Sequence, residues 1–455
     1  MIFSSLIFLF WFIPIFFTIY YIVPFRFKNA VLLIGSMIFY AWGEPKYMLL
    51  LILSVVVNYL AGRLIEKGRG RYDKAVLIAA VVFDLSMLFF FKYINFFIDN
   101  INSITQMDIS NIRLVLPLGI SFYTFQIMSY VIDLYRGKVS CEKSIIRLGA
   151  YLCMFPQLIA GPIVVYSEVS RELSDRKISL ADIEEGLKLF VIGLSAKVLV
   201  ANNAGKLWDE LITIGYDNIS APLAWLGMLA YTIQIYFDFN GYSMMAIGLG
   251  KMLGFRFPKN FDLPYTSCSI TEYWRRWHMT LSGWFREYLY IPLGGNRRGS
   301  IRTYVNLFIV WFATGFWHGA DWNFILWGLY FYALLMLEKL GLIKYLEANR
   351  IVARIYTLLA IEFGWMLFAI SDLTLLGKYL SVLFTGGLGS DILYYGRNYL
   401  VILLIGMLFS TPYPGRVYEK HRSHPAVLIL LTLMFAVCVA YLADASFNPF
   451  LYFRF

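Results

Sequence analysis

Apolar stretches long enough to cross a membrane recur along almost the whole chain, separated by short polar segments. A membrane-spanning helix needs about 20 largely apolar residues. The first stretch, residues 1–23, contains Pro14 and lacks both a basic start and a small-residue cleavage site, so we interpret it as a retained helix. The pattern predicts an all-α polytopic membrane protein with a bundle of roughly 11–12 transmembrane helices. We expect a single integral membrane domain over residues 1–455.

Basic residues indicate which connections face the cytoplasm, because Lys and Arg are enriched in loops on that side of a membrane. The basic connections are residues 63–74, 136–147, 171–188, 251–302, 339–354 and 416–422. Connections near residues 99–113, 206–217 and 372–391 are poorer in Lys and Arg and fit the outside. Counting the crossings between the two sets places both termini outside.

One apolar stretch, residues 148–166, breaks this alternation because both of its flanks are basic. A stretch that begins and ends on the same side must be re-entrant, and Pro156, Gly161 and Pro162 supply the break that such a turn needs. Irregular backbone at membrane depth is tolerated only where protein or a water-filled cavity lines it. We therefore expect a re-entrant segment at 148–166 that borders a cavity.

Residues 251–302 form the largest predicted cytoplasmic element, and the segment SITEYWRRWHMTLSGWFREYLYIPLGG within it resembles one amphipathic helix. Ser269 and Glu272 have capping-box spacing at its start, and the glycines after Pro292 end it. Five apolar side chains share one face at steps of three and four: Trp274, Trp277, Leu281, Trp284 and Tyr288. The pattern favours an interfacial helix, either as a plain anchor or with a basic surface that holds an anionic, phosphate-bearing donor.

Composition supports lipid as the main solvent, since 60% of the 455 residues are hydrophobic and only 15% are charged. The net charge of +10 is accounted for by cytoplasmic loops, and no nucleic-acid motif accompanies it. The four cysteines have no metal-ligand spacing, so we predict neither a metal site nor a nucleic-acid partner.

Of the four histidines, His318 is the strongest catalytic candidate because it follows an apolar run of about 15 residues that carries it more than about 20 Å from the basic edge. An ionisable residue at that depth suggests function, although a neutral imidazole can also serve as a hydrogen bond between helices. Asp321 and Asn323 follow closely enough to orient the ring. A neutral histidine is a suitable general base near pH 7. Other polar positions within apolar stretches are interpreted as interhelical hydrogen bonds: Asp84, Asp133, Gln234, Asp238 and Asn240.

Four segments carry a resemblance to a known family: LPLGISFYTFQIMSYVIDLYRG, FPQLIAGPI, SITEYWRRWHMTLSGWFREYLYIPLGGNRRG and ATGFWHGADWNFILWG. Together they cover most of residues 114–330, the predicted motif-bearing core. They resemble the membrane-bound O-acyltransferase family (MBOAT), and within it the bacterial branch that O-acetylates exported polysaccharides such as alginate. Val165 and Glu287 depart from the Arg and Asp usual in that branch.

The resemblance implies residue roles. His318 occupies the catalytic histidine position and His278 the second histidine position, with Trp317 beside the supporting residues Asp321 and Asn323. Our candidates for binding the acyl donor are Arg275, Arg276, Arg286 and Trp274, since guanidinium groups bind phosphate bidentately.

The resemblance also implies a function: an O-acetyltransferase in the inner membrane of a bacterium, with no bound cofactor. Acetyl-coenzyme A would donate from the cytoplasm, a polysaccharide hydroxyl would accept outside, and an extracytoplasmic SGNH-type O-acetyltransferase would be the partner. Peptidoglycan O-acetylation and D-alanyl transfer to teichoic acids are the alternatives within the fold. A transporter or flippase, or a structural secretion subunit, is the alternative outside enzyme chemistry.

Overall fold

The structure, a computed structural model, describes residues 1–444. Every regular element in this part of the chain is a helix, which confirms the predicted all-α class. The chain divides into two compact units: unit 1 comprises Met1–Phe190 and Ser243–Pro258, and unit 2 comprises Val191–Tyr242 and the described residues from Lys259 onward. The prediction of one membrane domain with a motif-bearing core stays a prediction.

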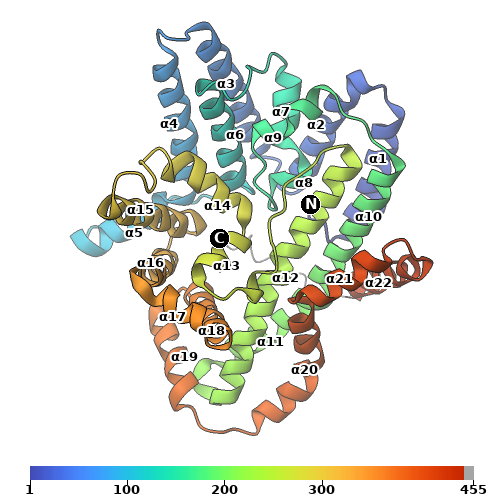
Figure 1. Ribbon diagram of the computed structural model, residues 1–455. Coiled ribbons are helices and arrows are strands. Elements are labelled where there is room, and N and C mark those ends of the chain that lie inside the picture. The colour runs from blue at the N-terminus through green and yellow to red at the C-terminus, as the bar shows by residue number, and fades with distance from the viewer. Residues whose placement is uncertain (445–455) are drawn as a thin grey trace. The chain divides into compact units, whose positions relative to one another are not determined.

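The first helices lie mainly in unit 1 (Figure 1): η1 Phe8–Phe12, α1 Ile13–Ile22, α2 Phe25–Ala41, α3 Met48–Lys67, α4 Asp73–Lys92, α5 Ile94–Thr105, α6 Ile120–Tyr135, α7 Ile145–Cys153, α8 Phe155–Leu158, α9 Tyr166–Ser174 and α10 Leu180–Ser195. The remaining helices lie mainly in unit 2: η2 Ala196–Ala201, α11 Asn202–Ile214, η3 Tyr216–Asn218, α12 Ala221–Leu253, η4 Pro264–Thr266, α13 Ile270–Arg276, α14 Met279–Phe285, η5 Arg286–Tyr290, α15 Ser300–His318, α16 Trp322–Leu337, η6 Glu338–Leu342, α17 Ile343–Ala348, α18 Arg350–Ala369, α19 Leu373–Thr385, α20 Asp391–Phe409, α21 Pro412–His421 and α22 Pro425–Asp444.

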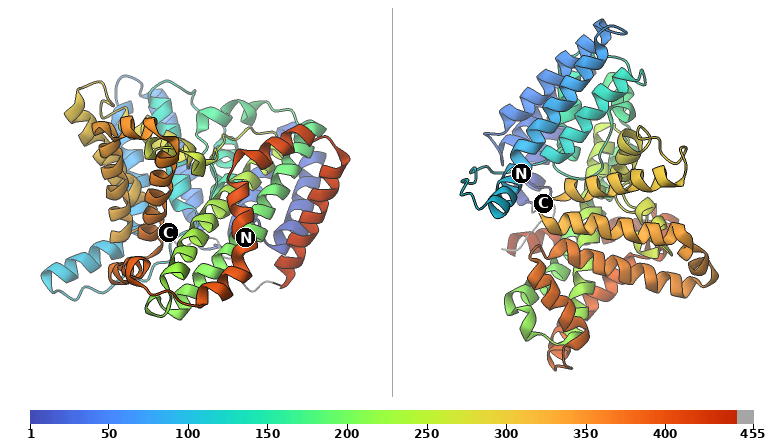
Figure 2. Two further views of the ribbon diagram at one scale, coloured as in Figure 1. Left: turned by 60° about the horizontal axis from the view of Figure 1, so that its bottom comes forward. Right: turned by 90° about the vertical axis from the view of Figure 1, so that its left-hand side faces the viewer.

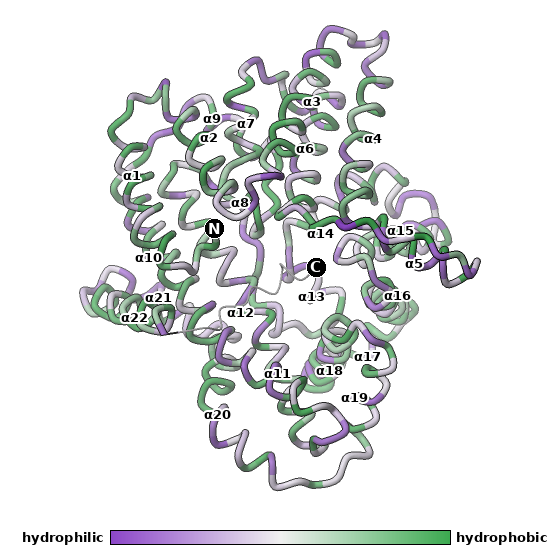
Figure 3. Tube along the Cα trace, turned by 180° about the vertical axis from the view of Figure 1, so that it is seen from behind, coloured by the Kyte–Doolittle hydropathy of each residue, from purple (hydrophilic) through white to green (hydrophobic). Residues whose placement is uncertain are grey.

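Within the described residues, six helices are long and apolar enough to cross a membrane: Met48–Lys67, Asp73–Lys92, Trp322–Ala348, Arg350–Ala369, Asp391–Phe409 and Pro425–Asp444. Figure 3 shows α3 and α4 coloured mostly as hydrophobic along their lengths. Other predicted spans fold as shorter helices, such as α6 with 16 residues. The chain is a multi-pass membrane protein, as its composition predicts.

Helices α3, α4 and α6 pack together in unit 1, and α3 and α4 run side by side in Figure 2. At the middle of this pair, Asn58 Nδ2 donates to Asp84 Oδ1 at 2.9 Å, and both residues are buried. This bond confirms the interhelical role predicted for Asp84, because an amide that bridges two helices satisfies polar atoms that lipid cannot.

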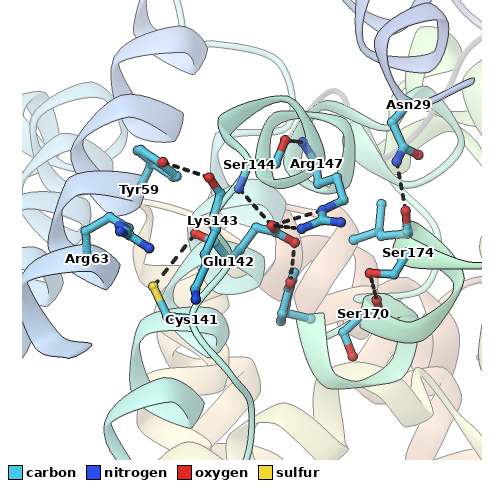
Figure 4. Close-up of polar contacts among 12 residues, drawn as sticks. Asn29, Tyr59, Arg63, Cys141, Glu142, Lys143, Ser144, Arg147, Ser170 and Ser174 are labelled. Carbon is cyan, nitrogen blue, oxygen red and sulfur yellow. Dashed lines mark hydrogen bonds and ion pairs between the residues drawn. The ribbon is translucent and has the colours of Figure 1, made fainter. Parts of the chain in front are cut away.

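The buried carboxylate of Glu142 connects the two ends of the segment predicted to be re-entrant. Figure 4 shows its contacts with Ser144 and Arg147. Arg147, just before the segment, donates to Glu142 Oε1 from Nε at 2.9 Å and from Nη2 at 2.7 Å. Tyr166, at its far end, donates its hydroxyl to Glu142 Oε2 at 3.0 Å. Tyr151 lies inside the segment and donates to the carbonyl of Val164 at 3.0 Å, so the chain folds back on itself. That it enters the membrane and returns stays a prediction.

Unit 2 contains an ion pair that is buried on both sides. Lys197, in the π-helix η2, lies 2.6 Å from Asp238 Oδ1 on α12, and their side chains are 2% and 4% exposed. Lys197 Nζ also donates to Asn202 Oδ1 at 2.9 Å. Because a charge in an apolar interior is costly unless it is paired, this contact fixes η2 against α12. It supports the interpretation of Asp238 as an interhelical contact.

Candidate active site

The deep histidine, His318, is the last residue of α15 and is 6% exposed. Three aromatic rings surround it edge to face, with centroids 5.0 Å away for Trp317, 5.0 Å for Trp327 and 5.3 Å for Phe368. These rings come from α15, α16 and α18. The imidazole therefore lies in an aromatic enclosure built by three helices of unit 2.

Close backbone packing between α15 and α16 positions this enclosure. A Cβ on Gly315 would overlap the carbonyl oxygen of Phe324, and a Cβ on Gly328 would overlap the carbonyl oxygen of Trp311. The two glycines thus let the helices approach more closely than any larger residue allows. Since His318 follows Gly315 by one turn, this close packing of the two helices sets the position of His318 beside Trp327.

The second histidine, His278, occupies a break between α13 and α14, where its φ of 43° places it in the left-handed region. Its ring is 2% exposed and lies edge to face with Phe239 of α12, with centroids 4.7 Å apart. Nδ1 of His278 lies 3.0 Å from Asn260 Oδ1. The hydroxyl of Thr280 donates to the same oxygen at 2.8 Å, and Met279 N donates to the Asn260 carbonyl at 2.9 Å. Asn260 therefore holds the break in place.

This environment fixes the protonation of His278. Because Asn260 Oδ1 is an acceptor, the bond places the imidazole proton on Nδ1 and leaves the lone pair on Nε2. Burial lowers the pKa of His278 to about 3, so the ring is neutral near pH 7. A ring this weakly basic is better suited to accepting a hydrogen bond at Nε2 than to removing a proton from a hydroxyl.

The indole of Trp317 is a ring neighbour of both histidines. Its ring centroid is 5.0 Å from that of His318 and 6.3 Å from that of His278. The structure thus brings together three of the residues predicted from the sequence, all within unit 2.

The two residues predicted to orient His318 bond to neighbouring backbone groups. Asp321 caps α16 by accepting from Trp322 N at 2.7 Å. Asn323 is buried and donates from Nδ2 to the carbonyls of Leu367 and Phe368, at 3.1 Å and 3.2 Å. Asn323 therefore anchors the end of α18, and through the Phe368 ring it supports the wall around His318.

The single amphipathic helix expected over this region is wrong, because the structure breaks it at Trp277 and His278 into α13 and α14. The physical reason is competition from the chain at 260–262, where Asp262 N donates to the Arg276 carbonyl and the Asn260 carbonyl accepts from Met279 N. The predicted start is confirmed, since Ser269 accepts from Glu272 N at 3.0 Å. An interfacial location stays a prediction.

The predicted donor-binding residues differ in their surroundings. Arg276 bonds to Glu272 at 2.8 Å and lies 3.8 Å from Asp262. Arg275 and Arg286 are exposed. Trp274 is buried, with its ring 5.4 Å from Trp327, which itself contacts His318.

A multi-pass helical membrane protein whose buried histidine is enclosed by aromatic rings fits the class of membrane-embedded acyl-transfer enzymes. The family model of membrane-bound O-acyltransferases matches residues 142–371. The chain belongs to this family and is an acyltransferase.

Three relatives indicate the range of acceptors within this family. The chain is 36% identical over 501 residues to a probable alginate O-acetylase, AlgI, of Azotobacter vinelandii, covering 100% of both chains. It is 36% identical to a peptidoglycan O-acetyltransferase of Helicobacter pylori, covering 82% of this chain and 78% of the relative. It is 29% identical to a teichoic acid D-alanyltransferase of Bacillus subtilis, covering 56% of this chain and 69% of the relative.

Sequence reasoning missed three residues that build the site: Asn260, Phe239 and Phe368. Phe239 lies beside Asp238, whose polar character drew attention to α12, so the neighbouring ring offered a weak signal. Asn260 stands 18 positions before His278 in a segment without regular structure, and no periodic pattern connects the two. Phe368 is one of many aromatic residues in the chain.

Proposed function

We propose that this protein moves an acetyl group from cytoplasmic acetyl-coenzyme A across the inner membrane of a bacterium to a hydroxyl on the outside. The final acceptor we propose, reached through an extracytoplasmic partner, is an exported polysaccharide of the alginate type. The full-length similarity to a probable alginate O-acetylase supports this choice. The termini would both face the outside, as the distribution of basic loops predicts.

The observation that carries the proposal is the enclosure of His318 by the rings of Trp317, Trp327 and Phe368. His318 would take the proton of the acceptor hydroxyl as its oxygen attacks the thioester carbonyl. The carbon–sulfur bond then breaks, and the proton passes to the departing coenzyme thiolate. General base catalysis of this kind contributes roughly 10²- to 10⁴-fold. The apolar walls would keep water from competing for the thioester.

The other predicted residues would act around this step. His278, neutral and held by Asn260 through Nδ1, would accept one hydrogen bond at Nε2 along the substrate path. Arg275 and Arg286 are exposed and are the better candidates for the phosphates of the coenzyme, because Arg276 already bonds to Glu272. An extracytoplasmic partner of the SGNH type would pass the acetyl group to the sugar.

The proposal is tested by release of coenzyme A from acetyl-coenzyme A in lipid nanodiscs, with and without the extracytoplasmic partner. We expect release that depends on the partner and falls by roughly 10²-fold or more in His318→Ala. The matched control is His421→Ala, which removes an exposed imidazole on α21. Release that persists unchanged in His318→Ala would refute the role of this residue. A complete absence of thioester turnover in wild type would point to carrier-bound acyl donors before a transporter.

Peptidoglycan is the second candidate acceptor, supported by the 36% identity to a peptidoglycan O-acetyltransferase. The two are separated by supplying mannuronate oligosaccharides or muropeptides to the same reaction and analysing each product for ester-linked acetate by mass spectrometry. Acetylation of mannuronate alone supports the first candidate, and acetylation of muropeptides alone supports the second.

A further inference from the structure

Arg176 is a buried arginine in unit 1, 7% exposed, whose hydrogen bonds all go to uncharged groups. Its Nε donates to Tyr20 Oη at 2.9 Å and to the Leu253 carbonyl at 3.2 Å. Its Nη1 donates to Asn29 Oδ1 at 2.7 Å and to the Glu172 carbonyl at 3.0 Å. Within residues 1–444 no carboxylate forms an ion pair with Arg176, and its buried Nη2 has no hydrogen-bond partner.

A second cation, Lys28, approaches the same place. Its Nζ lies 4.5 Å from the centroid of the Tyr20 ring, and the guanidinium carbon of Arg176 lies 5.7 Å from that centroid. Lys28 Nζ donates to the Tyr20 carbonyl at 2.6 Å, and in the described part of the chain it too has no acidic partner. Two cations this close repel each other unless an anion joins them.

Helix ends offset part of this charge. The carbonyls of Leu253, Glu172 and Tyr20 belong to the last turns of α12, α9 and α1. A helix C-terminus is equivalent to roughly half a negative charge. Three ends therefore supply at most about 1.5 charges against two full positive ones, and they leave Nη2 unbonded. The site therefore keeps a net positive charge and a hydrogen-bond donor, Arg176 Nη2, that has no acceptor among the described residues.

The turn between α1 and α2, next to these cations, exposes apolar side chains. Ile22, Phe25 and Phe27 are 77%, 38% and 47% exposed. Arg26 lies over the Phe27 ring, with its guanidinium carbon 4.6 Å from the centroid. Exposed aromatic residues that alternate with basic ones are typical of a segment at the membrane surface, where rings reach the acyl chains and cations reach the headgroups.

We propose that Arg176 and Lys28 bind the phosphate of an anionic phospholipid, such as phosphatidylglycerol, at the level of the headgroups. The phosphate oxygens accept hydrogen bonds from Nη2 of Arg176 and from Nζ of Lys28. The rings of Phe25 and Phe255, 5.4 Å and 4.6 Å from the guanidinium carbon, flank the charge. This lipid site uses none of the residues assigned to acyl transfer.

The test measures how many phosphatidylglycerol molecules the purified full chain retains in native mass spectrometry, and its thermal unfolding in nanodiscs with graded phosphatidylglycerol in phosphatidylcholine. We expect wild type to retain the lipid and to unfold at higher temperature as its fraction rises. Lys28→Gln should weaken the apparent affinity roughly fivefold, and Arg176→Gln should weaken it more. Arg63→Gln is the matched control, since Arg63 is exposed and already pairs with Glu66.

Lys28→Gln keeps the test decisive if Arg176→Gln fails to fold. Equal retention by wild type and Lys28→Gln would overturn the proposal, as would an equal loss in Arg63→Gln. Inorganic phosphate and coenzyme A are each added to nanodiscs of pure phosphatidylcholine, to test whether the site binds a soluble phosphate instead of a lipid. Stabilisation by either compound that disappears in Lys28→Gln would identify a soluble phosphate as the ligand and overturn the lipid assignment.

Discussion

Arg147 and Tyr166 bond to opposite oxygens of one carboxylate, that of Glu142, although 18 residues separate them. The hydrogen bond from Ser144 N to Oε1, at 2.8 Å, completes the set. The apolar stretch between Arg147 and Tyr166 therefore starts and finishes at the same point in unit 1. An element that crosses a membrane once separates its ends by about 30 Å, and this one does not.

Replacing the buried carboxylate should destabilise unit 1. We expect Glu142→Gln to lower the free energy of unfolding by about 1.5–3 kcal/mol, because it removes charged hydrogen bonds to Arg147 and Tyr166. Chemical denaturation in detergent micelles measures this. Glu66→Gln, which removes an exposed pair with Arg63, should cost less than about 1 kcal/mol. Equal losses in the two variants would contradict a special role for Glu142.

The same geometry predicts membrane topology. Cysteines introduced at Lys143 and Ser167, both exposed, should react with a membrane-impermeant maleimide from the same side of the membrane. The background needs the four native cysteines replaced. Labelling from the cytoplasmic side at both positions supports a re-entrant segment, and labelling from opposite sides would show a single crossing.

The Lys197–Asp238 pair should behave as a unit. Lys197→Met leaves a buried carboxylate without its cation, so we expect a loss of about 3–5 kcal/mol of stability. Adding Asp238→Leu to that variant should recover most of the loss, since two apolar residues can replace a buried pair at little cost. A double-mutant cycle by thermal or chemical unfolding measures the coupling. Additive losses would show that the two charges act separately.

Stability should depend on pH through His278. Its pKa is about 3 in the folded protein and near 6.5 in an unfolded chain. Between these values the unfolded state binds a proton that the folded state does not, so stability falls as pH drops from about 6.5 towards 3. His278→Gln should make this part of the stability curve shallower. The comparison is a series of unfolding midpoints, and an unchanged slope in the variant would count against a neutral, buried ring.

The contact between α15 and α16 should be sensitive to one methyl group. Gly328→Ala places a Cβ against the Trp311 carbonyl, and we expect it to cost about 1–3 kcal/mol and to reduce acyl transfer by shifting His318. Gly396→Ala, in α20 with open space around it, should be neutral or slightly stabilising. Unfolding and turnover are measured on both variants. A Gly328→Ala protein with wild-type behaviour would show that the two helices can separate without consequence.

The sequence predicts well what depends on composition and local pattern. The membrane class follows from the apolar stretches, and the start of α13 follows from the spacing of Ser269 and Glu272. The sequence also predicts the importance of His318, because a lone imidazole is unusual after a long apolar run. These inferences hold because lipid burial and helix capping are decided by residues close together in the chain.

The break at His278 could not be predicted in this way. The apolar period runs without interruption through Trp274, Trp277 and Leu281, so the local pattern favours one helix. The competing hydrogen bonds come from Asn260 and Asp262, in a segment that has no regular structure of its own. Tertiary contacts override a periodic pattern when a distant segment offers the backbone better partners.

At His278 the backbone conformation favours a different residue type from the one that the site holds. A residue other than glycine held there stores roughly 1–3 kcal/mol of strain, which the bonds to Asn260 and the ring contacts offset. Glycine adopts this conformation without strain. Histidine therefore stands at a position where the backbone favours glycine. A glycine there would keep the break between α13 and α14 and would lose only the imidazole.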